Sequence, residues 1–433
     1  MGRPKKNSAA PAYTPKKIQG LLGMEDIAPE ADPLWGLLFR RLNSLSRIYG
    51  FEKAEPPILE DIRLHENFYK DSPKDLNAGV KVQSSGTEAV LRYDFLPGIL
   101  RQYYNNKIYE KSPLSKWAYS GFVAKLGKTG LVTDFRYGFE VFGLFNHLTE
   151  AQVVGGVWKL LVDLGLTDAV LEINHLGKED CQTAYVKTLQ DFLQGKKYQL
   201  CDDCNEHLDG RVLNVLRCEN LDCQALFSEA PAILDFLDDE SKTHFTNILE
   251  ALDEMGIPYQ LNPLYAGPYG HGKTNIVIKY KFKDKTVILG EGGYHESLIH
   301  NLCGKSYCCF GFSGSLSRLR EILEAAKVVA VKETKTDVFL VPLGELAAKR
   351  SLRLFRDLTD QKIIVYDHFG SAGVKNQLKA AESGHAPIAL IMGQKEAIEE
   401  SMVVRNVSNR EQETVSLSNL CDFLKNLDKG KKS

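Results

Sequence analysis

Four cysteines lie close together in the middle of the chain, at spacings that suit a metal ion. Two residues separate Cys201 from Cys204, and four residues separate Cys218 from Cys223. Each close pair can offer two thiolates to one point, which is the donor set that a tetrahedral Zn²⁺ requires. The spacing therefore predicts a structural zinc site, closed by four sulfurs and without an open position for catalysis. Four unligated thiols are the alternative interpretation.

A glycine-rich segment, residues 267–274, matches the phosphate-binding loop pattern letter for letter. That loop requires a buried strand before it and a helix after it, because the N–H groups of the helix terminus must meet the phosphates. Here Pro263 interrupts the preceding segment, Pro268 lies inside the loop, and residues 275–282 alternate like a strand. The context favours a glycine-rich turn between strands over a nucleoside triphosphate site.

Length and composition limit the class of protein. The 433 residues exceed one hydrophobic core and predict two or three domains. Hydrophobic residues make up 43% and charged residues 25%, as in globular proteins, and no apolar run suits a transmembrane helix. The net charge of −2 gives no overall attraction to nucleic acid, so RNA contacts need a local basic face. Nine cysteines without an export signal indicate reduced thiols in a cytoplasm.

The N-terminal residues 1–17 form a basic segment of their own. They carry five basic residues and no acid, and they lack the apolar stretch of a secretory signal. We expect a disordered basic tail, and a weak RNA-contacting arm is the alternative.

Hydrophobic periodicity predicts the elements that position the polar residues up to residue 325. Helical spacing of apolar residues predicts helices at 33–50 and 149–164. The region 172–259, which carries the four cysteines, is mainly helical in pattern. Alternating residues predict antiparallel strands within 116–143 and 275–289, the latter with a turn at Lys283-Asp284-Lys285.

The pattern changes beyond residue 333, where short strands and helices alternate. This order is typical of a small α/β domain with a mostly parallel sheet. We expect strands at 338–342, 363–366 and 388–392, and helices at 346–358 and 372–382. The boundary between the domains is expected within 325–336, where charged residues replace the hydrophobic pattern.

Seven phrases, in this order, resemble those of class II histidyl-tRNA synthetases over nearly the whole chain after the tail. They are residues 49–60, like the first class II motif; 91–94 with Arg101; 135–140, like the end of the second motif; the cysteine-bearing region with 230–237 and His244; 311–319, like the third motif; 386–393; and 403–407 with Glu411. No single phrase is decisive, but seven in the right order are specific.

The resemblance implies a fold and a domain plan. It implies an α+β class II core, an antiparallel sheet flanked by helices, with a homodimer formed through the first motif. We assign residues 18–170 and 257–325 to this core, 171–256 to a helical insertion with the zinc site, and 334–430 to an anticodon-binding-type α/β domain.

The resemblance also implies roles for single residues. Lys125 and Arg318 would be the catalytic cations near ATP. Asp94, Arg136, Glu140 and Tyr294 would bind the substrate. In the C-terminal domain the candidate tRNA contacts are Lys375, Lys379 and Arg405. Ordinary solvated charges are the alternative interpretation for these three residues and for Asp94, Lys125, Glu140 and Arg318.

Several positions depart from the family pattern. Lys125 replaces the second-motif arginine, although a one-residue error in aligning that loop would change this assignment. Leu96 replaces a threonine beside the substrate's amino group, and Arg136 replaces a glutamine near the imidazole ring. The family's Arg-Gly-Leu-Asp-Tyr-Tyr segment reads differently at 266–271 and contains no arginine. Each lost transition-state donor typically costs about 10²–10³ in rate.

The sequence therefore predicts a histidyl-tRNA-synthetase-like, tRNA-binding protein with impaired or altered adenylate chemistry. Histidine activation would use ATP and Mg²⁺, with histidine and tRNA as substrates. One alternative is a non-catalytic regulatory subunit of the ATP phosphoribosyltransferase type, although such proteins generally lack the C-terminal domain. The other is an enzyme that adenylates another small carboxylic acid, since Arg136 would repel a protonated imidazole.

Overall fold

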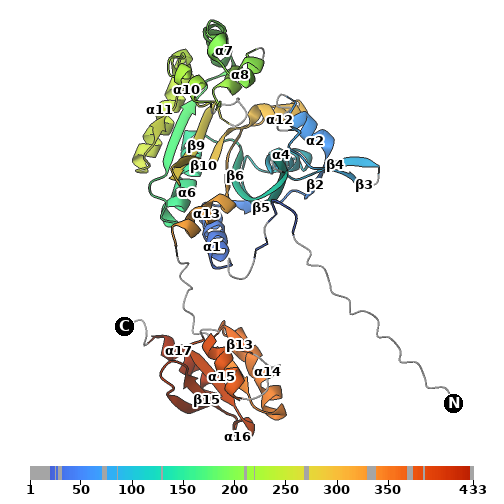
Figure 1. The fold of residues 1–433 in the computed structure, drawn as a ribbon, viewed down its shortest axis with the longest axis vertical. Helices are drawn as coiled ribbons and strands as arrows, with labels where there is room; N and C mark the ends of the chain where they lie inside the picture. Colours follow the sequence, from blue (N-terminus) through green and yellow to red (C-terminus); the bar gives the residue numbers. More distant parts are fainter. Residues whose placement is uncertain are drawn as a thin grey trace, which may run out of the picture. The chain divides into compact units, whose positions relative to one another are not determined.

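The structure is a computed structural model, and it divides into two compact units, Met1–Ala330 and Val331–Ser433. Figure 1 shows the elements of both units. The residues that it describes are 20–24, 26–27, 32–70, 76–84, 86–127, 130–208, 212–218, 220–267, 273–328, 338–367, 374–383 and 386–429. The basic tail 1–17 and most of the glycine-rich segment lie outside the described residues.

An eight-stranded sheet is the centre of the first unit. Its strand order is β1-β5-β6-β11-β10-β9-β7-β8. All neighbouring strands are antiparallel except the pairs β1–β5 and β7–β8. The strands are β1 Glu52–Lys53, β5 Leu114–Gly127, β6 Gly130–Gly143, β7 Val170–His175, β8 Gln260–Leu261, β9 Thr274–Phe282, β10 Lys285–Tyr294 and β11 Cys309–Ser315. This antiparallel sheet, flanked by helices, confirms the predicted core.

Alternation along β6 directs its side chains into two separate hydrophobic layers. Tyr137, Phe139 and Val141 pack on one face, and Phe142 packs on the other. Helices α1, α6 and α13 cover the first face, and α2, α4 and α12 cover the second. Their bounds are α1 Asp32–Ile48, α2 Ile62–Phe68, α4 Leu96–Asn105, α6 His147–Asp163, α12 Glu296–Cys303 and α13 Leu316–Ala325.

The hairpin between β9 and β10 has the predicted turn. Lys283 and Asp284 have φ values of 48° and 62°, and Lys285 begins β10. Two successive positive φ values are typical of the tight turn whose twist matches that of the flanking strands. A smaller sheet in the order β2-β4-β3 lies beside the second face, with β2 Leu59–Asp61, β3 Lys81–Ser84, β4 Thr87–Leu91 and the short helix α5 Ile108–Lys111.

Helices dominate the insertion, as the sequence predicts, and they share a hydrophobic cluster of their own. They are α7 Glu179–Gln194, η1 Lys197–Gln199, α8 Asp202–His207, α9 Val212–Val215, α10 Leu221–Phe227, η2 Ile233–Phe236 and α11 Asp239–Glu254. Strand β7 at the start of this region pairs with β9 and therefore belongs to the main sheet.

The second unit is an α/β domain with a five-stranded sheet in the order β13-β12-β14-β15-β16. The pairs β12–β13 and β12–β14 are parallel, whereas β14–β15 and β15–β16 are antiparallel. The sheet is thus mixed, not mostly parallel, because the chain returns through a β15–β16 hairpin. The elements are β12 Val338–Pro342, α14 Glu345–Asp360, β13 Val365–Asp367, α15 Val374–Ser383, β14 Ile388–Met392, α16 Gln394–Glu399, β15 Ser401–Asn406, β16 Gln412–Ser416 and α17 Leu420–Lys429.

The helices in the described part of the chain were compared in length and hydropathy with what a bilayer requires. None of its helices has both the length and the apolar character needed to cross a bilayer.

Candidate active site

A cavity of about 270 Å³, here called the inner pocket, lies on the face of the main sheet that α2, α4 and α12 cover. Its charged lining includes Asp94 from the segment before α4, Lys125 from β5, Arg136 and Glu140 from β6, and Glu291 from β10. Arg136 and Glu140 are four residues apart on one strand, so both side chains point to the same face. The structure thus brings four of the predicted site residues together.

Glu140 is the fully buried acid of the inner pocket. It accepts hydrogen bonds from the Tyr119 hydroxyl at 3.2 Å and from the Cys309 thiol at 3.6 Å. The His295 Nε2 atom lies 3.6 Å from its carboxyl. Burial raises the pKa of Glu140 to about 8, and burial lowers the pKa of His295 to about 4. At neutral pH both groups are therefore uncharged, and their contact is not an ion pair.

Asp94 is the acid held at the start of α4. Its carboxylate accepts a hydrogen bond from the Tyr69 hydroxyl at 2.7 Å and another from the backbone N–H of Leu96 at 3.0 Å. These two donors fix the carboxylate in the pocket wall. An ammonium group of a substrate could bind to it there.

A second cavity of about 700 Å³, here called the outer pocket, shares lining residues with the inner pocket. Lys125, Asp134, Arg136 and Glu291 line both cavities, whereas Arg318 lines only the outer one. A carboxylate in the inner pocket and a phosphate in the outer pocket could therefore meet beside the same two cations. Adenylate formation requires this arrangement, because negative charge accumulates where the two groups react.

The two predicted cations of β6 and α13 are held differently. Arg136 donates to Ser313 Oγ at 2.9 Å, and its guanidinium lies 3.8 Å from the Asp134 carboxylate. Arg318 is half-exposed and lies 3.9 Å from Glu321 on the same helix. Arg136 is thus fixed within the wall, and Arg318 can reorient toward a ligand.

Arg217 also lines the inner pocket, and it is not among the residues predicted from the sequence. It follows helix α9 in the insertion, so its guanidinium reaches the pocket from a different part of the first unit. The segment that aligns with the family's Arg-Gly-Leu-Asp-Tyr-Tyr phrase contributes no arginine to the pocket. Arg217 supplies a guanidinium there from the insertion. The one signal in the sequence is its position next to Cys218, because a predicted metal ligand marks an ordered turn.

Tyr294 lines neither pocket, although the sequence predicts it as a substrate-binding residue. Its hydroxyl donates to buried Glu150 at 2.6 Å. The same carboxylate accepts a hydrogen bond from Thr274 at 3.0 Å, and His244 Nε2 lies 2.9 Å from it. Tyr294 thus takes part in a buried polar network on the opposite side of the sheet from Glu140.

The three candidate RNA contacts lie on one side of the second unit's sheet. Lys375 and Lys379 are exposed and one turn apart on α15. Arg405 on β15 is the cross-strand partner of Ala389, which packs in the hydrophobic cluster that includes α15 residues. Directly paired residues point to the same face of a sheet, so Arg405 lies on the α15 side.

The four cysteines of the predicted metal site also converge. The sulfur atoms of Cys201, Cys204, Cys218 and Cys223 all lie within 4.8 Å of one another. Within the described part of the chain this is the group of residues best suited to hold a metal ion.

Comparisons with known proteins agree with this architecture. The family model described as "Histidyl-tRNA synthetase" matches residues 23–319, and the one described as "Anticodon binding domain" matches residues 337–427. The histidine–tRNA ligase of Caldicellulosiruptor bescii is 25% identical over 415 residues, covering 94% of this chain and 99% of that protein. The apo histidyl-tRNA synthetase of S. aureus has a TM-score of 0.78 at 24% identity and covers 94% of this chain and 100% of that one.

A further solved structure has the same fold. It is titled an ATP phosphoribosyltransferase regulatory subunit/histidyl-tRNA synthetase from Bacillus halodurans C. The TM-score is 0.61 at 17% identity, covering 88% of this chain and 99% of that one. At this identity the similarity concerns the fold alone.

Proposed function

Because the chain belongs to the histidyl-tRNA synthetase family, we propose that it binds tRNA and activates histidine roughly 10³-fold more slowly than a typical relative, or slower still. ATP and Mg²⁺ are the cofactors that the family implies. Lys125, Arg136 and Arg318 would face the phosphates of ATP across the two adjoining pockets. The slow step in this proposal is the formation of the acyl phosphate bond.

The burial of Glu140, which keeps its carboxyl protonated at neutral pH, is the observation that carries the proposal. Of the acids that line the inner pocket, Glu140 is the fully buried one, so an imidazole bound beside it depends on the charge of that carboxyl. Glu140 already contacts Tyr119 and Cys309, and the chain's own imidazole, that of His295, lies beside it. Because Glu140 is protonated at neutral pH, it attracts a histidine ring weakly.

The cations of the pocket support the same conclusion. Lys125 provides a point charge where the resemblance expects the planar fork of an arginine, which binds phosphate through two parallel hydrogen bonds. Arg136 lies where a glutamine is expected, and it repels a protonated imidazole or ammonium group. Both changes reduce transition-state stabilisation for histidine.

The same cations favour one alternative substrate class. Lys125, Arg136 and Arg217 all line the inner pocket, and Asp94 can still receive an ammonium group. This set suits a small acid with a second carboxylate better than it suits histidine. The second candidate function is therefore the adenylation of such an acid.

Amino-acid-dependent pyrophosphate exchange tests the proposal. The purified full-length chain is assayed with MgATP and single amino acids or small dicarboxylic acids, with the S. aureus histidyl-tRNA synthetase as the positive control. We expect a histidine-dependent rate below about 10⁻³ of the control, together with retention of tRNA in a filter-binding assay that weakens as salt increases. Histidine exchange within tenfold of the control would refute the slow chemistry. Failure to retain micromolar tRNA would refute the binding, and exchange with a dicarboxylic acid would support the second candidate.

We also propose that the chain forms a homodimer through the region of the first motif. Ile48, Ile58, Leu59 and Leu114 are large apolar side chains that are exposed in this region. Light scattering is expected to give twice the chain mass of 48.5 kDa. Ile58→Glu should give a monomer, whereas Ile398→Glu, an equally exposed position in the second unit, should not. A wild-type chain that is monomeric at about 10 µM would contradict the proposal.

A further inference from the structure

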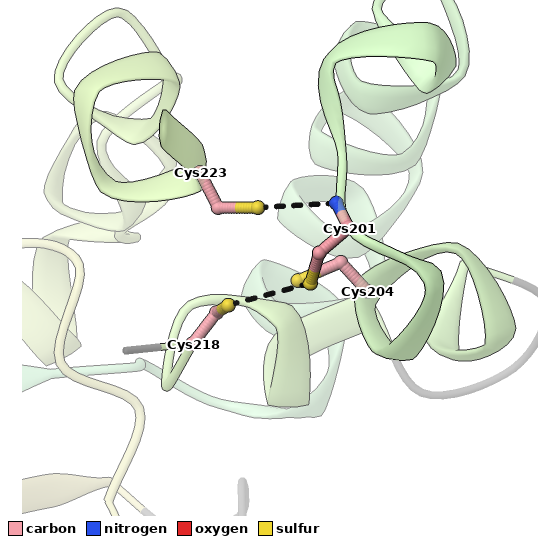
Figure 2. Close-up of side chains that lie close together, drawn as sticks. All are labelled: Cys201, Cys204, Cys218 and Cys223. Carbon is pink, nitrogen blue, oxygen red and sulfur yellow. Dashed lines mark hydrogen bonds between the residues drawn. The ribbon is translucent and has the colours of Figure 1, made fainter. Parts of the chain in front are cut away.

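The four sulfur atoms of the insertion come from three separate short elements. Figure 2 shows the side chains of Cys201, Cys204, Cys218 and Cys223 turned toward a common centre. Cys201 precedes α8, Cys204 lies within it, Cys218 follows α9, and Cys223 belongs to α10. Two of them, Cys204 and Cys223, are buried.

The spacing of the sulfurs fits a tetrahedral ion. Four sulfurs at about 2.3 Å from a central Zn²⁺ lie about 3.8 Å from one another. Cys201 Sγ and Cys218 Sγ are 3.7 Å apart, and no distance within the group exceeds 4.8 Å. All nine cysteines of the chain are free, so no disulfide accounts for this convergence.

Backbone N–H groups already point at two of these sulfurs. The Cys201 N–H donates to Cys223 Sγ at 3.3 Å, which Figure 2 marks with a dashed line. The Asn220 N–H donates to Cys218 Sγ at 3.4 Å. Such donors orient the ligands of a metal and stabilise the negative charge of thiolates.

The helices that carry the cysteines are short and depend on tertiary contacts. Helices α8, α9 and α10 are six, four and seven residues long. Isolated helices of this length are not stable in water. The four cysteines lie in or against the hydrophobic cluster that these helices share, and a metal ion bound by all four would cross-link the helices.

We propose that Cys201, Cys204, Cys218 and Cys223 bind one Zn²⁺ as a structural site. Four thiolates fill the coordination sphere, so the ion has no open position for a substrate or water. Sulfur ligands in a tetrahedron select zinc over Mg²⁺ or Ca²⁺, which prefer oxygen ligands. The site stabilises the insertion and takes no part in bond formation.

The zinc site also fixes the position of one residue of the inner pocket, and the role of that residue rests on the proposed function. Arg217 immediately precedes Cys218, and it lines the inner pocket. Zinc bound to Cys218 fixes the turn that carries Arg217. The insertion thus supplies a guanidinium to the pocket through a metal-anchored turn.

Metal analysis of the full-length chain, purified without chelators, tests the proposal. We expect one zinc per chain by mass spectrometry of the metal, and X-ray absorption with four sulfurs at about 2.3 Å. Cys201→Ser and Cys218→Ser should each retain less than about a tenth of the zinc. His207→Ala should retain all of it, because His207 lies in the same segment but bonds to the Asp203 carbonyl. Iron instead of zinc, a disulfide within the four, or less than a tenth of a zinc per chain would overturn the proposal.

A second measurement covers variants that fail to fold. A zinc chelator removes the ion from the wild-type chain without modifying its thiols, and hydrogen exchange then reports where protection is lost. We expect one equivalent of zinc to appear, with faster exchange in residues 200–227 and unchanged exchange in the second unit. Faster exchange elsewhere, with residues 200–227 unaffected, would contradict the assignment. Neither measurement uses histidine or tRNA, so the zinc site and the proposed function can fail separately.

Discussion

Replacing Gly311 with alanine is expected to lower the free energy of unfolding of the first unit by about 3 kcal/mol or more. Gly311 on β11 is the cross-strand partner of Glu140 on β6. A Cβ atom at Gly311 would lie 1.8 Å from Glu140 Oε2. Glu140 cannot move aside easily, because it is fully buried and bonded to Tyr119 and Cys309. The inner pocket must therefore deform or the strands must separate.

Tryptophan fluorescence in a urea titration measures this loss. The three tryptophans, Trp35, Trp117 and Trp158, all belong to the first unit, so the signal reports this unit alone. Gly36→Ala is the matched control. It lies inside α1, and its new Cβ would meet only the end of the Arg40 side chain at 3.2 Å. This variant should be unchanged or about 1 kcal/mol more stable, because alanine favours helix.

A double variant shows whether the contact with Glu140 causes the loss. Glu140→Ala removes the carboxyl and leaves room for the new Cβ atom. The double variant Gly311→Ala with Glu140→Ala should therefore lose at least about 1 kcal/mol less than the sum of the two single losses. Additive losses would show that Gly311 matters for another reason, such as backbone conformation.

The resemblance to a known family allowed four charged residues of the inner pocket, Asp94, Lys125, Arg136 and Glu140, to be predicted from the sequence. Lys125, Arg136 and Glu140 lie on β5 and β6, where alternation determines which face each side chain occupies. The same rule explains the position of Tyr294. It lies three residues after Glu291 on β10, and residues three apart on a strand point to opposite faces.

Arg217 could not be predicted from sequence patterns. It follows a four-residue helix in an insertion, and its place in the pocket depends on how the insertion packs against the main sheet. No periodicity of residues encodes such a long-range contact. The antiparallel hairpin of β15 and β16 was also not predicted, because the alternating strands and helices before it favour a parallel sheet.

The contribution of Glu140 to the stability of the first unit is expected to fall as the pH rises from 6.5 to 8, and Glu140→Gln should remove this contribution. Burial raises the pKa of Glu140 from 4.5 to about 8 in the folded chain. Between these values the folded state keeps a proton that the unfolded state has released. The unfolded state then binds fewer protons, so the unfolding free energy decreases with pH. One proton over this window corresponds to roughly 2 kcal/mol.

Three histidines give the opposite slope below pH 6.5. Burial lowers the pKa of His65 and His295 to about 4 and of His175 to about 3. Their unfolded forms take up protons first as the pH falls, so stability decreases with acidification. This slope extends above pH 6.5, where the unfolded histidines are still partly protonated, so the effect of Glu140 is best isolated as the difference between the wild type and Glu140→Gln at each pH.

Urea titrations of the wild type and of Glu140→Gln at pH 6.5, 7, 7.5 and 8 make the comparison. Glutamine keeps the shape of the protonated acid and cannot ionise, so the two stability curves should diverge as the pH rises. Glu254→Gln, at an exposed position, should instead run parallel to the wild type. Parallel curves for Glu140→Gln would mean that Glu140 is ionised at neutral pH. The inner pocket would then hold a further negative charge, beside Asp94 and Glu291, able to attract a protonated imidazole. The argument for slow histidine activation would lose its main support.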